Sequence, residues 1–199
     1  MQKSLKRLVI DTATPHLYLG LYDGDKEIDS YYKEGRNDHS VKLMVELEQM
    51  LNRTNNTMQV IDEIVIGIGP GSYTGLRVGV VVAKMFAWTL GIPVYQVSSL
   101  ALLASSIEEG FIIPAVDARR GNAFLGLYQI KQGEVVLEEN EELANLASYQ
   151  EKHQADTIFH GKPDMGKLFD TNLLEQLEDV HQLVPNYLRL TEAEKNAKK

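Results

Sequence analysis

The sequence predicts an α/β protein of two related lobes, of which the second is reduced, and two observations carry this prediction. First, residues 64–104 contain a buried strand, a glycine-rich turn, an apolar helix, and a short strand that leads into another helix. Second, the chain contains an internal repeat, because residues 10–22 align with residues 116–128. Their separation is far too long for a solenoid repeat. A duplicated lobe is therefore expected, although chance similarity between two amphipathic hairpins is the alternative.

Apolar periodicity predicts the elements of the first lobe in order. We expect helices at residues 38–52 and 73–90, and strands at residues 5–11, 17–22, 28–33, 61–68 and 94–97. The apolar positions of the first helix cover more than one stripe, so one face can pack on a sheet while another meets a partner. The second helix carries only Arg77 and Lys84 as charges, which indicates either full burial or a half-buried helix with an apolar exposed face.

The second half of the chain is less strongly patterned. Residues 129–183 show weak periodicity, and the polar run Glu138–Glu142 is interpreted as a solvated turn and helix start. The expected organisation is a first lobe at residues 1–100 and a smaller second lobe at residues 101–190. The charged residues 191–199 are expected to form a frayed tail.

The glycine-rich turn allows two interpretations. Gly69 and Gly71 flank Pro70, and Ser72 or Thr74 can cap the helix that follows. A strand, a glycine turn and a helix N-terminus can bind an anion, because free N–H groups point outward there. No Gly-Lys-Ser/Thr follows the glycines, so the turn is not a Walker A loop. A tight structural turn is favoured over a phosphate site.

Composition excludes several classes of function. The net charge is −8, which argues against a lone, electrostatically driven nucleic-acid binder. The chain has no cysteine, so disulfides, thiolate metal sites and cysteine nucleophiles are excluded. The longest apolar run is broken by Lys84 and is too short for a membrane span, and no signal-peptide core is found. We therefore expect a cytoplasmic protein.

Two aspartates occupy equivalent positions in the repeat. Asp11 and Asp117 are each expected at a hairpin turn, and in a phosphotransferase of this design such acids hold magnesium and the phosphates of a nucleotide. They can equally be turn acids that accept bonds from local N–H groups. Arg119 and Arg120 can bind a phosphate or carboxylate, with exposed hairpin arginines as the default. His39 is interpreted as a capping or interface residue rather than a general base.

Five motifs in this order resemble one known family. They are Arg36–Ser40, Gly69–Gly79 (GPGSYTGLRVG), Pro93–Ser99, Val116–Arg120 and Pro185–Arg189. Together they resemble the TsaB (YeaZ) family, and the duplicated hairpin lobes resemble the actin, Hsp70 and sugar-kinase (ASKHA) superfold. The resemblance implies two RNase H-like, actin-like lobes, the second reduced.

The resemblance also implies a function. It implies a non-catalytic scaffold subunit of the machinery that makes N6-threonylcarbamoyladenosine in tRNA, with no activity expected from the chain alone. The sister protein TsaD performs the transfer with a metal, and the ATPase TsaE joins the complex. Sister proteins carry a His-x-x-x-His metal motif, for which this chain has Ser99 and Leu103. These side chains cannot replace two imidazoles, so no metal site is expected.

Members of the family are expected to pair with TsaD, or with themselves as a homodimer, through the first two helices. They are expected to contact tRNA only indirectly, through the assembled complex. The implied interface residues are Val41, Met44, Val45, Leu47, Arg77, Val80, Val81, Lys84 and Trp88. The alternative is an independent ATP-binding or hydrolysing protein of the sugar-kinase type. Its nucleotide site would use Asp11, Gly69, Gly71, Ser72 and Asp117. ATP and magnesium are otherwise expected only at the assembled complex.

Overall fold

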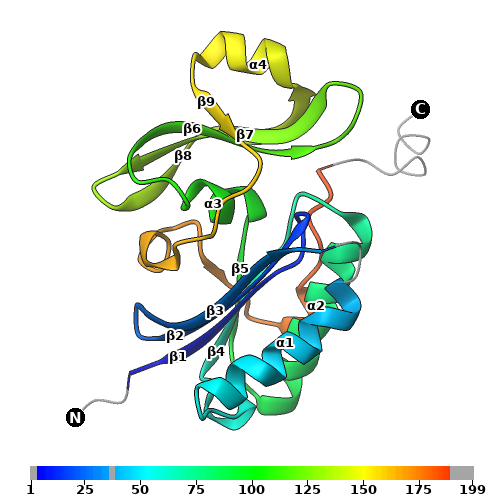
Figure 1. Ribbon diagram of the computed structural model, residues 1–199, viewed down its shortest axis with the longest axis vertical. Coiled ribbons are helices and arrows are strands. Elements are labelled where there is room, and N and C mark those ends of the chain that lie inside the picture. Colours follow the sequence, from blue (N-terminus) through cyan, green and yellow to red (C-terminus); the bar gives the residue numbers. More distant parts are fainter. Residues whose placement is uncertain (1–3, 36–38, 189–199) are drawn as a thin grey trace.

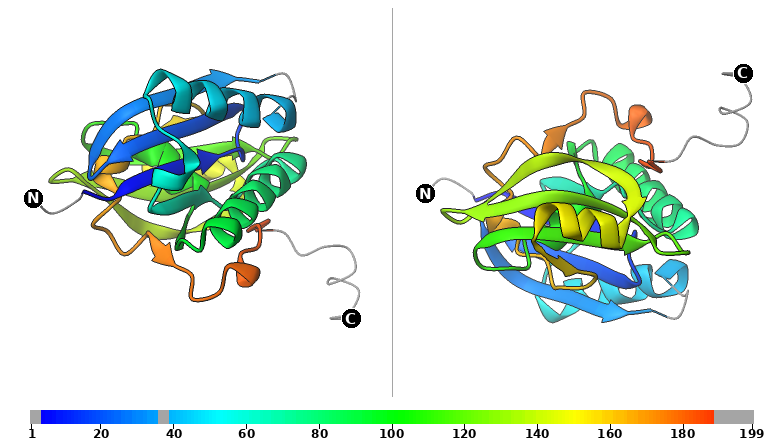
Figure 2. Two further views of the ribbon diagram at one scale, coloured as in Figure 1. Left: turned by 90° about the horizontal axis from the view of Figure 1, so that it is seen from below. Right: turned by 90° about the horizontal axis from the view of Figure 1, so that it is seen from above.

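The computed structural model describes residues 4–35 and 39–188, which form two stacked β-sheets with helices between and outside them (Figure 1). The predicted start of the first helix at Asp38 and the tail at 191–199 lie outside the described residues. Figure 2 shows α1 and α2 on one outer face of the molecule and α4 on the opposite outer face.

The first sheet is mixed and has six strands, in the spatial order β10-β5-β4-β1-β2-β3. Its strands are β1 (Lys6–Asp11), β2 (His16–Asp23), β3 (Lys26–Glu34), β4 (Glu63–Gly67), β5 (Val94–Val97) and β10 (Glu175–Gln176). Antiparallel β1 and β2 pair Asp11 with Tyr18, and parallel β1 and β4 pair Val9 with Val65. Because β1 and β4 are covered on both faces, their central residues, Leu8–Ile10 and Ile64–Ile66, are all apolar.

Two helices cover one face of this sheet: α1 (His39–Arg53) and α2 (Tyr73–Leu90). Leu43 and Met50 of α1 pack with Ala83 of α2 against Leu8, among other residues of β1 and β4. The short η1 (Met58–Val60) leads into β4. Gly91 ends α2 in the left-handed conformation, at φ 65°, which a glycine adopts without steric strain.

The second sheet has four strands, in the order β8-β7-β6-β9, and repeats the pairing of β3-β2-β1-β4 in the first. Its strands are β6 (Gly110–Asp117), β7 (Asn122–Lys131), β8 (Glu134–Asn145) and β9 (Asp156–Ile158). In both sheets the first two strands form an antiparallel hairpin and a parallel strand flanks the first. The expected duplication with a smaller second copy is therefore present.

The polar run Glu138–Glu142 differs from its prediction. It lies within β8 and pairs with β7, instead of forming a turn and helix start. Exposed and partly buried positions alternate from Val136 to Glu142, and glutamates stand at both kinds of position. Charged residues on an edge strand suppress unwanted strand pairing. The helix begins later, at α4 (Leu146–His153), which Asn145 caps by accepting a bond from Ser148 N–H.

The space between the sheets holds α3 (Ser99–Ala104), whose residues are all buried. Val9 and Val65 of the first sheet and Tyr128 of the second pack against it in one core cluster. Tyr149 of α4 covers the opposite face of the second sheet. The layers are therefore α1 and α2, first sheet, α3, second sheet, and α4.

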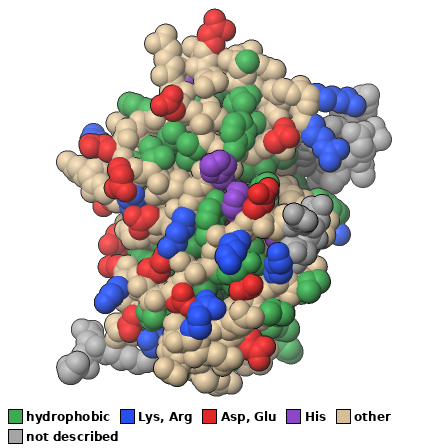
Figure 3. Space-filling view, in the orientation of Figure 1, with side chains coloured by type: hydrophobic (Ala, Val, Ile, Leu, Met, Phe, Trp, Pro, Cys, Tyr) green, Lys and Arg blue, Asp and Glu red, His purple; other side chains and the backbone are tan. Residues whose placement is uncertain are grey.

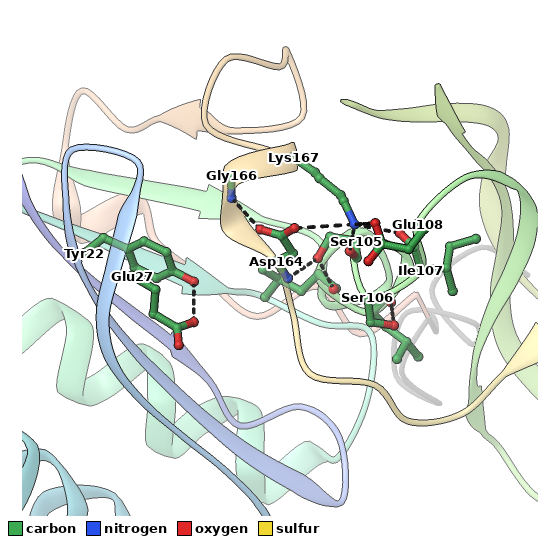
Figure 4. A network of polar contacts seen from close by, with 11 residues as sticks. Tyr22, Glu27, Ser105, Ser106, Ile107, Glu108, Asp164, Gly166 and Lys167 are labelled. Atoms are coloured by element: carbon green, nitrogen blue, oxygen red, sulfur yellow. Dashed lines mark hydrogen bonds and ion pairs between the residues drawn. The ribbon is translucent and has the colours of Figure 1, made fainter. Parts of the chain in front are cut away.

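The last described part of the chain returns to the first sheet. It contains η2 (Met165–Lys167), β10 and η3 (Val180–Gln182), and Leu183 is buried in the core beneath α2. Lys167 Nζ donates to the carbonyl oxygens of Ser105 and Ile107 at 3.2 and 2.8 Å, just beyond the end of α3 (Figure 4). This buried cation satisfies carbonyls at a helix C-terminus and so fixes the returning segment to the interior.

Among the described residues, no helix combines the length and hydrophobicity that are needed to cross a bilayer.

Candidate functional site

A cavity of about 590 Å³ lies where the turns of both sheets meet the start of α2. One wall consists of residues from the β1–β2 turn, α1 and the glycine-rich turn, and the other comes from the second sheet. The polar lining residues are Thr14, His39, Ser40, Ser72, Thr74, Asp117 and Arg119. Of the predicted nucleotide-site residues, Gly71, Ser72 and Asp117 line this cavity, whereas Asp11 and Gly69 do not.

The glycine-rich turn packs tightly against the β1–β2 turn. A Cβ at Gly71 would overlap the carbonyl group of Ala13, and one at Gly75 would overlap the carbonyl oxygen of Thr12. Ser72 N–H donates to Ala13 O at 2.7 Å, and Thr12 Oγ1 donates to Gly75 O at 2.7 Å. These contacts explain why glycines stand here, and they leave the Ser72 N–H engaged rather than free for an anion.

Asp11 forms a buried network at the same junction. Its Oδ1 accepts bonds from Ala13 N–H at 3.0 Å and from Ser99 Oγ at 2.9 Å. Ser99 Oγ in turn accepts a bond from Gly69 N–H at 3.1 Å. Burial raises the pKa of Asp11 to about 6, against the lowering effect of these bonds. Asp11 therefore ties the first hairpin to the glycine-rich turn and to the start of α3.

The two equivalent aspartates differ in environment. Asp117 is exposed at the cavity wall, and its Oδ1 accepts a bond from Arg119 N–H at 2.8 Å. Asp11 instead borders a separate space of about 10 Å³, beside His16 and Tyr32. The structure does not bring the two carboxylates together in one cavity.

The positions that correspond to the sister metal motif are both internal. Ser99 is used by the Asp11 network, and Leu103 is a buried apolar residue of α3. Across residues 4–35 and 39–188, no group of three or more His, Asp or Glu side chains is arranged to hold a metal ion.

His39 has a structural role that the sequence only partly suggested. It is buried at the start of α1, and its Nε2 lies 3.0 Å from Thr14 O. Because a carbonyl oxygen only accepts, Nε2 carries the proton. The imidazole thus joins the start of α1 to the β1–β2 turn.

The outer surfaces of α1 and α2 form the second notable feature, which we call the helical face. Besides Tyr73 at the start of α2, whose ring stacks on Tyr187, it exposes six large apolar side chains, which are Val41 (70%), Met44 (41%), Val45 (47%), Val81 (62%), Met85 (45%) and Trp88 (72%). Figure 3 shows hydrophobic side chains along the lower right of the molecule, where these helices lie. Five of the six were predicted as interface residues. Met85 was not, although its i+4 spacing from Val81 places it on the same side of the helix.

The other predicted interface residues add no apolar surface to the helical face. Leu47 and Val80 are buried in the core, because their positions on the helices face the first sheet, and this corrects their assignment to an exposed face. Arg77 and Lys84 bind the returning C-terminal segment. Arg77 Nε donates to Tyr187 Oη at 3.2 Å, and Lys84 Nζ donates to His181 O at 3.0 Å.

Comparison with known proteins identifies relatives over most of the chain. Residues 33–173 match the family model described as TsaD, tRNA N6-adenosine threonylcarbamoyltransferase. The tRNA threonylcarbamoyladenosine biosynthesis protein TsaB of Bacillus subtilis is 37% identical, over 94% of this chain and 95% of its own length. The protein of the same name from Escherichia coli is 27% identical, over 63% of this chain and 55% of its own length.

A solved structure shares the fold. YeaZ from Pseudomonas aeruginosa superimposes with a TM-score of 0.77 at 22% identity, covering 92% of this chain and all of that one. The predicted α/β architecture of two actin-like lobes is thereby confirmed. Together with the 37% identity over nearly the whole length, these matches show that the chain belongs to the TsaB (YeaZ) family.

Proposed function

We propose that this chain is a non-catalytic scaffold subunit in the biosynthesis of N6-threonylcarbamoyladenosine in tRNA, and that it pairs with a TsaD-type paralogue through the helical face. The observation that carries the proposal is the set of six exposed apolar side chains on two neighbouring helices. An apolar patch of this kind on a globular protein marks an interaction site. Family membership supports the choice of partner.

The helical face suits a protein partner in composition. Trp88 and Met85 are residue types that are enriched in the buried centres of interfaces, and Val81 is exposed on the same helix. A second copy of this chain presents the same face, so a homodimer and the heterodimer would compete for it. We infer that the homodimer is displaced when the paralogue is present.

Two buried residues of α3 support a non-catalytic role. Ser99 and Leu103 supply no imidazole, and Ser99 is engaged by Asp11. We propose that the transfer reaction, ATP and magnesium belong to the assembled complex, that TsaE docks on the surface the two paralogues form together, and that tRNA is reached through the complex in the cytoplasm.

The test is titration calorimetry of the chain with the TsaD-type protein from the same genome. The wild type is expected to bind with 1:1 stoichiometry. Met44→Glu is expected to weaken binding strongly, because the carboxylate would be desolvated without a partner. Val136, an exposed valine on β8 of the second sheet, offers a matched control as Val136→Glu. Equal affinity of Met44→Glu and the wild type would contradict the proposal.

A second candidate, independent ATP binding, is favoured only by the size of the cavity, since about 590 Å³ is in the range of small-molecule sites. Calorimetry with magnesium and ATP on the isolated chain tests it. Binding that Asp117→Asn removes would support this candidate, and absence of heat would exclude it.

A further inference from the structure

We propose that a hollow beside β8 binds a small aliphatic amine, whose ammonium group pairs with the Glu141 carboxylate. The hollow has a volume of about 450 Å³, and none of its lining residues borders the cavity of about 590 Å³ described above. The proposal is independent of the proposed function, because it involves neither the helical face nor that cavity.

Two hydroxyl groups hold the Glu141 carboxylate in the hollow. Its Oε1 accepts bonds from Ser98 Oγ, just before α3, and from Tyr128 Oη of β7. Gly126 leaves room for the glutamate, because a Cβ there would lie 3.3 Å from Glu141 Cγ. Both bonds end on Oε1, and across residues 4–35 and 39–188 no hydrogen bond or ion pair reaches Oε2. One carboxylate oxygen is therefore available to a ligand.

The internal repeat supplies a comparison, because Tyr22 holds the position in β2 that Tyr128 holds in β7. Tyr22 Oη donates to Glu27 Oε2 at 3.1 Å (Figure 4), and Ser30 Oγ donates to Glu27 Oε1 at 2.8 Å. In both sheets, a tyrosine and a serine thus bind a glutamate on the strand that follows the tyrosine. In the first sheet the glutamate also has a cation, since Lys162 Nζ lies 2.6 Å from Glu27 Oε1.

The second copy lacks this cation. In the part of the chain that the structure describes, no lysine or arginine forms an ion pair with Glu141. Burial acts to raise the pKa of both carboxyl groups. At Glu27 the bonds from Lys162 and Ser30 outweigh burial, and the pKa is lowered. At Glu141 burial outweighs the two hydroxyl bonds, and the pKa is raised. An ammonium group at Oε2 would supply the missing charge.

The rest of the lining indicates the body of the ligand. Four apolar residues line the hollow together with the carboxylate, and they are Ala101, Leu137, Leu173 and Leu188. An aliphatic chain on this lining is shielded from water while its ammonium group donates to the carboxylate. The volume lies in the range of small-molecule sites, which favours a free amine over a larger partner.

The test is an NMR titration of the ¹⁵N-labelled chain with butylammonium chloride, followed through the amide shifts of the residues that line the hollow. We expect saturation with a Kd of about 1 mM, which suits so small a ligand. Butan-1-ol has the same length without the charge and is expected to bind about tenfold more weakly. Equal affinity for the alcohol would overturn recognition by the carboxylate.

Glu141→Gln keeps an acceptor for both hydroxyl donors and removes the negative charge. It is expected to weaken butylammonium binding by about tenfold while Tm stays within a few degrees of the wild type. Glu142→Gln is the matched control, because Glu142 is exposed on the same strand and its replacement removes the same charge. The control is expected to bind as the wild type does. Equal weakening by both variants would indicate general attraction to an acidic strand and would overturn the proposal.

A measurement on the wild type needs no variant. The pKa of the Glu141 carboxyl group, followed by NMR of its side-chain carbon, is expected to fall when butylammonium is added, because a nearby cation stabilises the charged form. An unchanged pKa at saturating amine would contradict pairing at Oε2.

A last arm distinguishes a free amine from a lysine side chain. Nα-acetyl-lysine methylamide carries the same ammonium group next to a peptide unit and is expected to bind no more tightly than butylammonium. Tighter binding would assign the hollow to a lysine of a partner protein and would overturn the choice of a small amine. If neither probe shifts the lining amides, the proposal fails, whereas pairing with the TsaD-type protein is unaffected by any of these results.

Discussion

Replacement of Val81 by aspartate tests the helical face most sharply. The side chain is 62% exposed in the free chain, so its loss removes little internal packing. Full burial of a valine is worth about 1.5 kcal/mol, of which about 1 kcal/mol would be lost at the interface. A carboxylate buried there without a partner adds roughly 3 kcal/mol. The total, about 4 kcal/mol, corresponds to a roughly thousandfold weaker Kd.

The assay is calorimetric titration with the TsaD-type partner, with thermal unfolding of the free variant as the check on folding. Val136→Asp is the matched control, because Val136 is an exposed valine on β8 of the second sheet. We expect the control to bind normally and Val81→Asp to unfold within a few degrees of the wild type. Binding of Val81→Asp within threefold of the wild type would refute the reasoning.

Three further predictions concern the buried junction. Asp11 has a folded pKa of about 6, above its unfolded value, so the folded state binds more protons between about pH 4 and 6 and its stability falls as pH rises through that window. Between pH 4 and pH 7 in urea unfolding, the free energy of unfolding of Asp11→Asn should therefore rise by about 2 kcal/mol relative to that of the wild type. A difference that stays constant with pH would contradict the burial argument. Ser99→Ala removes a donor to the Asp11 carboxylate and the acceptor of the Gly69 N–H. It should lower stability by about 1–3 kcal/mol at pH 7 and by less at pH 4, where only the loss at Gly69 remains in full. An equal loss at both pH values would exclude a role through Asp11. Gly71→Ala should lower the free energy of unfolding by about 3 kcal/mol, because the new Cβ would overlap the Ala13 carbonyl. Gly133→Ala, with open space around the new Cβ, should lower it by only about 1 kcal/mol. Similar losses of stability at both sites would argue against tight packing of the glycine-rich turn.

Local sequence patterns predicted much of the first sheet. Strands β1 and β4 were recognisable because parallel central strands are apolar on both faces, and the Asp11 and Asp117 repeat indicated the second hairpin. The run Glu138–Glu142 was misinterpreted, because pairing with β7 fixes its conformation while its own side chains are those of a solvated segment.

The candidate site depended more on long-range contacts. The sequence did not show that Leu47 would be buried and Val45 exposed, because α1 is apolar on more than one side and contact with the sheet decides which side is buried. The bonds from Arg77 and Lys84 to the returning segment join residues about a hundred positions apart, and no local pattern reveals them. The same holds for the contact between Ser99 and Asp11.

The central claim, a required but non-catalytic subunit, is tested most directly by reconstitution. Unmodified tRNA, threonine, bicarbonate, ATP, the threonylcarbamoyl-AMP synthase, the TsaD-type protein and TsaE are combined with and without this chain, and the modified adenosine is quantified by mass spectrometry. We predict modification only when the chain is present, and its loss with Val81→Asp. Equal yield without the chain would contradict the account.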